Sequence, residues 1–154
     1  MEEFFTFREY MHHEGNDLTP SMEDYVEMIF RLSNNTGFTR INDIAAALNV
    51  QPSSVSRMIQ KLAETGYLNY EKYGVVVLSE KGKQVGEKLI IRHNLSQEFL
   101  SLIGITEHLL EETEKIEHTL SDHTLSRIEA LVAFFKKNPK ILNKYKKFCE
   151  EHLV

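Results

Sequence analysis

Apolar residues recur every three to four positions over most of the chain, a spacing that predicts a mainly helical protein. The first helix starts at about residue 20, where Ser21 is a suitable N-cap, and it ends before Gly37. Residues 39–50 contain a short second helix that ends in a turn. Residues 51–66 contain a third, with Pro52 in its first turn. The spacing therefore predicts two short helices joined by a tight turn, preceded by a longer one.

Two short extended segments follow these helices, at residues 67–71 and 75–78, and their separation predicts a β-hairpin. A helix, a tight turn, a second helix with a polar outer face and a hairpin form, in this order, a winged helix-turn-helix. The alternative is a small helical domain with an incidental hairpin. The agreement of four elements in order and spacing favours a DNA-binding domain.

The second half of the chain has a helical period throughout. Its helices are expected at 79–103, 106–118, 121–137 and 139–152. Many large apolar side chains fall in its last 50 or so residues, which indicates packing against a second copy of the chain. The expected fold is thus mainly α, with a winged helix-turn-helix joined by a long helix to an all-helical dimerisation domain. The expected division is an N-terminal extension at 1–18, the DNA-binding domain at 19–78, and the linker helix with the helical domain at 79–154.

Composition excludes several other classes of protein. No run of about 18 uncharged apolar residues is present, so no membrane span is expected, and the N-terminus does not have the pattern of a secretory signal. Both observations predict a cytoplasmic protein. The one cysteine, Cys149, can form neither an internal disulfide nor a cysteine-based zinc site. The formal net charge is −5, yet residues 53–93 carry an excess of positive charge, which suits phosphate binding.

Polar side chains on the outer face of the third helix and at the hairpin tip are the candidates for DNA contact. They are Ser53, Ser54, Ser56, Arg57, Gln60, Lys61, Lys72 and Tyr73. Arg57 and Gln60 have the donors and acceptors that read base edges. Phosphate contacts are expected from Ser53, Ser54, Lys61 and Lys72. On charge alone, a solvated basic face remains the simpler interpretation.

Acidic and histidine side chains on three predicted helices form a candidate metal site. The six residues are Asp24, Glu27, His93, Glu114, Glu117 and His118. Each helical spacing puts its members on one face, and carboxylates that converge repel one another unless a cation neutralises them. Oxygen and imidazole donors without sulfur suit Mn(II) or a similar divalent ion. Taken singly, each piece also fits a solvated face, a helix N-terminus or a core histidine.

Several motifs together resemble the manganese transport regulators, the manganese-sensing branch of the diphtheria toxin repressor family of metalloregulators. The matching stretches are TPSMEDYVE at 19–27, PSSVS at 52–56, YEKY at 70–73, RH at 92–93 and EKIEH at 114–118. The resemblance assigns all six candidate ligands to a pair of metal ions in each subunit. It implies a homodimeric repressor of manganese uptake genes that binds a palindromic operator when Mn(II) is bound. The iron-sensing branch has Met and Cys where this chain has Asp24 and Glu114.

Three features depart from that pattern. The N-terminal extension carries His12 and His13, for which a packing arm and an extra metal site are both open interpretations. The wing tip has no arginine, and the basic last helix is expected to be solvated.

Alternative functions are an iron-responsive or organic-ligand-responsive winged-helix regulator. A di-metal hydrolase is not favoured, because the sequence offers no separate nucleophile and no Gly-rich phosphate loop. The protein is therefore not expected to be an enzyme.

Overall fold

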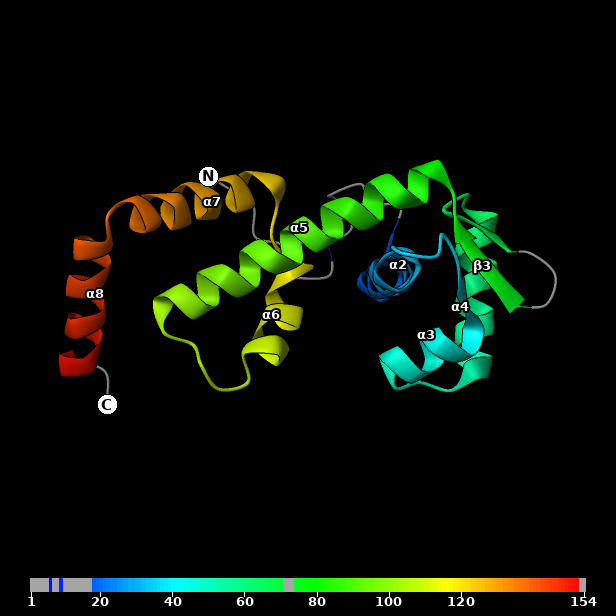
Figure 1. Ribbon diagram of the computed structural model, residues 1–154, viewed down its shortest axis with the longest axis horizontal. Helices are drawn as coiled ribbons and strands as arrows, with labels where there is room; N and C mark the ends of the chain where they lie inside the picture. The colour runs from blue at the N-terminus through cyan, green and yellow to red at the C-terminus, as the bar shows by residue number, and fades with distance from the viewer. Residues whose placement is uncertain (1–5, 7–8, 10–17, 71–73, 153–154) are drawn as a thin grey trace. The chain divides into compact units, whose positions relative to one another are not determined.

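The computed structural model describes residues 6, 9, 18–70 and 74–152 and divides the chain into two compact units (Figure 1). The first unit comprises residues 1–90 and the second comprises residues 91–154, so that the division falls inside helix α5 (Glu80–Ile103). His12 and His13 of the extension and the wing-tip residues Lys72 and Tyr73 lie outside the described residues.

Three helices form the body of the N-terminal unit: α2 (Pro20–Ser33), α3 (Ile41–Leu48) and α4 (Pro52–Glu64). The N-cap of α2 is Thr19, whose side chain accepts a hydrogen bond from Met22 N at 3.3 Å. The choice of Ser21 was wrong because Pro20 already occupies the first helical position, which makes the residue before it the cap. Between α3 and α4, Asn49 adopts a left-handed conformation with φ 54°, which makes the predicted turn tight.

A small antiparallel sheet completes this unit. It contains β1 (Thr39–Arg40), β2 (Leu68–Tyr70) and β3 (Val75–Leu78) in the order β1-β3-β2. The hairpin of β2 and β3 was predicted, whereas β1 was not. A two-residue strand has no period of its own, and β1 exists only because Thr39 pairs with Val76 on the distant β3.

The core of the N-terminal unit lies between the three helices and the sheet. Val26, Ile44, Ile59 and Val76 are fully buried there, and they come from α2, α3, α4 and β3. Burial of the apolar stripe of α4 leaves its opposite face exposed. The predicted winged helix-turn-helix architecture is confirmed.

The C-terminal unit is all helical. After the second half of α5 come α6 (Leu109–Glu117), α7 (Asp122–Lys137) and α8 (Pro139–His152). Ser121 caps α7, as predicted, by accepting a hydrogen bond from Thr124 N at 3.2 Å. Lys136 on α7 forms an ion pair of 2.5 Å with Glu98 on α5. Within the described ranges, no helix combines the length and the apolar character that crossing a bilayer requires.

Large apolar side chains remain exposed on α7 and α8. They are Leu131, Phe134, Ile141 and Phe148, each 41–57% exposed. In a single chain this apolar surface is exposed to water. Such a surface is what we expect of a domain that packs against a second copy of the chain.

Candidate metal centre

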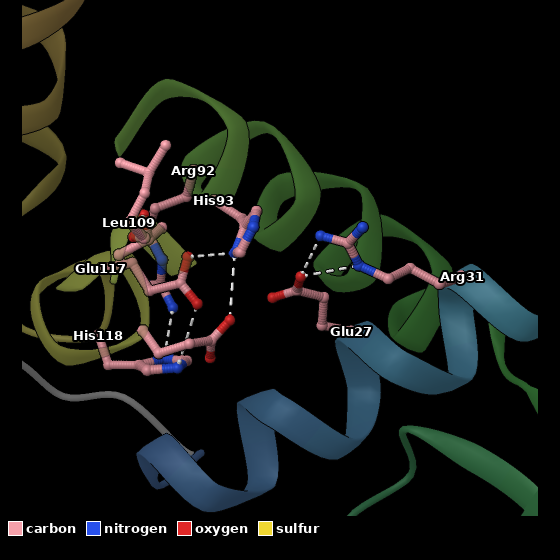
Figure 2. A network of polar contacts seen from close by, with 9 residues as sticks. Glu27, Arg31, Arg92, His93, Leu109, Glu117 and His118 are labelled. Atoms are coloured by element: carbon pink, nitrogen blue, oxygen red, sulfur yellow. Dashed lines mark hydrogen bonds and ion pairs between the residues drawn. The ribbon is translucent and has the colours of Figure 1, made fainter. Parts of the chain in front are cut away.

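His93 of α5 and two glutamates of α6 meet in the C-terminal unit (Figure 2). The side chain of His93 points toward α6, and its Nδ1 lies 2.9 Å from Glu117 Oε2 and 3.5 Å from Glu114 Oε1. His93 follows Leu89 by one helical turn, and both are buried, at 5% and 4% exposure. His93 therefore lies on the buried side of α5, together with Leu89.

The Glu117 carboxylate is the most deeply buried charged group of this cluster, at 1% exposure. Among the described residues, neither of its oxygens accepts a hydrogen bond of good geometry. The imidazole nitrogens His93 Nδ1 and His118 Nε2 are nearby, at 2.9 and 3.4 Å. Burying an ionised carboxylate costs several kcal/mol unless a positive charge lies beside it. A bound cation would supply that charge to Glu117. The donor set fits a divalent metal ion.

Glu114 and His118 lie at the edge of the same cluster. The Glu114 side chain is 47% exposed and that of His118 is 8% exposed, and the two offer ligand atoms within 4.8 Å of each other. Their four-residue spacing at the end of α6 puts them on one face. The structure thus brings together four of the six predicted ligands, all of them in the C-terminal unit.

Asp24 and Glu27 belong to α2 in the N-terminal unit. Glu27 is buried, and its Oε1 accepts hydrogen bonds from Nε and Nη2 of Arg31 at 3.0 and 2.6 Å. Asp24 is half-buried and lies next to the buried Tyr25. Burial, and secondarily the negative charge of Asp24, raises the pKa of the Tyr25 hydroxyl, which keeps that hydroxyl neutral.

Two arginines contact predicted ligands and were not singled out in the sequence. Arg31 follows Glu27 by four residues, so helical spacing alone was a sufficient signal for that pair. Arg92 donates from Nη2 to Nδ1 of His118 at 3.0 Å, across 26 residues of sequence. No local pattern identifies the second contact.

The outer face of α4 carries most of the predicted DNA contacts. Arg57, Gln60 and Lys61 are exposed there, as are Ser53 and Ser56, whereas Ser54 is half-buried. The Arg57 Nε donates to the Ser53 carbonyl oxygen at 3.4 Å. A donor-rich helical face with this much exposure has the shape and chemistry of a recognition helix.

Two family profiles together match most of the chain. Residues 17–76 match the profile described as "Iron dependent repressor, N-terminal DNA binding domain". Residues 79–146 match the one described as "Iron dependent repressor, metal binding and dimerisation domain". The first match contains α2 to α4, and the second contains the clustered residues His93, Glu114, Glu117 and His118.

Among similar proteins is the HTH-type transcriptional regulator MntR of Oceanobacillus iheyensis, 47% identical over 134 residues, with 86% of this chain and 91% of that protein covered. MntR of Bacillus subtilis (strain 168) is 46% identical over 138 residues, with 87% and 97% covered.

A solved structure of the manganese regulator SloR is 29% identical, with a TM-score of 0.67 and coverage of 76% of this chain and 55% of that one. The chain thus spans about half the length of that structure. This chain belongs to the iron-dependent repressors, the diphtheria toxin repressor family. It is a metal-dependent, DNA-binding transcriptional regulator and not an enzyme.

Proposed function

We propose that this chain is a cytoplasmic, Mn(II)-activated repressor of manganese uptake genes that binds a palindromic operator as a homodimer. The observation that carries the metal dependence is the buried Glu117 carboxylate, which lies close to the imidazoles of His93 and His118. A bound cation would stabilise such a cluster strongly, because it compensates the buried negative charge.

The chemistry of the donors supports manganese over softer ions. All of the candidate ligands offer oxygen or imidazole nitrogen, and neither Met nor Cys is among them. The relatives from Oceanobacillus and Bacillus carry the name MntR, and the solved structure of SloR is titled a manganese regulator. Affinity alone would rank Zn(II) and Cu(II) above Mn(II), so the response to the metal has to be measured as well as the binding.

We assign two ions to each subunit, with Asp24 and Glu27 completing the set formed by His93, Glu114, Glu117 and His118. Four carboxylates carry a charge of about −4 when ionised, which two divalent ions balance. The ions would supply the positive charge that lets these carboxylates stay ionised side by side.

Ligands on α2 give the metal a route to the DNA-binding surface. Helix α2 packs against α3 and α4, so a constraint on α2 is transmitted to the recognition helix. In a dimer, the distance between two recognition helices must match the half-site spacing of the operator. Metal binding promotes DNA binding only to the extent that it favours the matching arrangement.

The test is a titration of a labelled manganese-transporter promoter fragment with the purified protein, followed by fluorescence anisotropy at fixed salt. Mn(II), Fe(II) and a chelator form the three arms. We expect tight binding with Mn(II) and weak binding with the chelator. Equal affinity in all three arms would overturn metal control. A stronger response to Fe(II) would make the chain an iron-responsive regulator, the function that its family profiles are named for.

Substitutions on α4 should distinguish the residues that contact bases from those that contact phosphates. Arg57→Ala should cost about 1–3 kcal/mol of specific binding and relax the sequence preference, because arginine reads guanine through two hydrogen bonds. Lys61→Ala, on the same exposed face, should weaken specific and non-specific DNA alike and lower the salt dependence. The measurement is the ratio of operator to scrambled-DNA affinity. The same ratio in both variants would contradict this assignment.

A further inference from the structure

The contact with Arg92 leaves the imidazole of His118 without a free lone pair for a metal ion. Its Nη2 lies 3.0 Å from His118 Nδ1 (Figure 2). A guanidinium only donates hydrogen bonds and stays protonated in proteins, so Nδ1 must be the acceptor. A neutral imidazole has a single acceptor nitrogen, and the proton of His118 therefore lies on Nε2.

The surroundings of Nε2 agree with this tautomer. Nε2 faces Glu117 Oε1 at 3.4 Å, a position where an N–H is attracted by the carboxylate. The imidazole is thus engaged by Arg92 on one side and directed at Glu117 on the other. A metal ion binds a nitrogen only through its lone pair, so coordination by His118 at either nitrogen requires the Arg92 contact to break.

The charge of Arg92 acts in the same direction. Its Nε is buried, and the guanidinium places a permanent positive charge beside the cluster of Glu114, Glu117 and His118. In the absence of metal this charge offsets part of the carboxylate repulsion. When a divalent cation arrives, the same charge repels it.

We propose that Arg92 is an internal competitor of the metal, a cation of the chain that occupies His118 until Mn(II) displaces it. This inference rests on the proposed function, because it assumes that His118 is a ligand. Such a residue stabilises the metal-free protein and raises the metal concentration at which the regulator responds.

The test compares Arg92→Gln and Arg92→Lys with the wild-type chain. We expect Arg92→Gln to bind Mn(II) about tenfold more tightly, the factor that corresponds to one lost hydrogen bond to a charged group. Its metal-free form should also unfold at a lower temperature. Arg92→Lys keeps the charge and a donor, so its affinity should lie between the two. Electron paramagnetic resonance of unbound Mn(II) gives the affinity, and a thermal scan with chelator gives the stability.

Lys115→Gln is the matched control. It removes one positive charge from α6, but that ammonium pairs with Glu111 and Glu112 at 2.6 and 3.1 Å on the solvent side. Hydrogen bonds to Glu111 and Glu112 raise the pKa of Lys115, so the wild-type side chain is charged at neutral pH and the substitution removes a full positive charge. The Mn(II) affinity of this variant should change by less than about twofold, since exposed charges are screened.

A second readout does not need metal. Imidazole ¹⁵N–¹H NMR of the metal-free wild type should show His118 protonated at Nε2, and Arg92→Gln should add the Nδ1 tautomer. A proton on Nδ1 in the wild type, or unchanged or weaker Mn(II) binding in Arg92→Gln, would overturn the competitor role. Loss of Mn(II) binding in the wild type itself would instead overturn the proposed function, and the NMR spectrum would still decide the Arg92 contact.

Discussion

Glu117→Gln should abolish most of the Mn(II)-dependent gain in operator affinity, with a loss of about 100-fold or more in metal affinity. The substitution keeps the shape of the side chain and removes one charge from a group that is 1% exposed and faces two imidazoles. An amide oxygen is a much weaker ligand for a hard divalent ion than a carboxylate. The measurement is operator binding by anisotropy, with Mn(II) and with chelator.

Glu112→Gln is the control for this substitution. Glu112 lies on the same helix, and its carboxylate is 45% exposed and pairs with Lys115 at 3.1 Å, so its loss should leave the Mn(II) response as in the wild type. The metal-free Glu117→Gln protein should unfold at the same temperature as the wild type or higher, because a buried charge has been removed. A folded Glu117→Gln protein that keeps the full Mn(II) response would exclude Glu117 as a ligand.

Local periodicity was enough to predict the helix-turn-helix. The turn at Asn49, the start of α4 at Pro52 and the exposure of Arg57 all follow from residues a few positions apart. The same reasoning placed Glu114, Glu117 and His118 on one helical face. Features that depend on a spacing of three or four residues are accessible to a sequence pattern.

Burial within that face could not be predicted. Spacing treats Glu114 and Glu117 as equivalent, yet one side chain is 47% exposed and the other 1%. The difference arises from how α6 packs against α5, which brings His93 over Glu117 at 2.9 Å. The short strand β1 was missed for a similar reason, since its partner β3 follows more than thirty residues later. Contacts between distant segments are set by tertiary packing, which a single sequence does not encode locally.

Arg92 illustrates the same limit at the metal centre. The residue stands next to His93 in the motif RH, and no role for it follows from the sequence pattern. Consecutive helical residues point in different directions, so nothing local links Arg92 to the imidazole of His118, which lies 26 residues later in the chain. Only the fold of α6 back onto α5 brings the guanidinium to His118.

Gly82→Ala should lower the free energy of unfolding of the N-terminal unit by about 3 kcal/mol, a large loss from one methyl group. Alanine inside a helix normally stabilises by about 1 kcal/mol relative to glycine. Here a Cβ on Gly82 would lie 1.9 Å from the Tyr67 carbonyl oxygen, a backbone atom that accepts the hydrogen bond of Ser79 N. Helix α5 would have to move off the sheet and break that bond.

Urea unfolding measures the loss in the free energy of unfolding. Lys83→Ala, at an exposed position of the same helix, is the control that should leave the stability unchanged. Gly86→Ala should cost less, because the atoms nearest to its Cβ, from 2.7 Å, would belong to the Phe30 side chain and not to the backbone. Wild-type stability of Gly82→Ala would refute the close packing of α5 on the backbone at Tyr67.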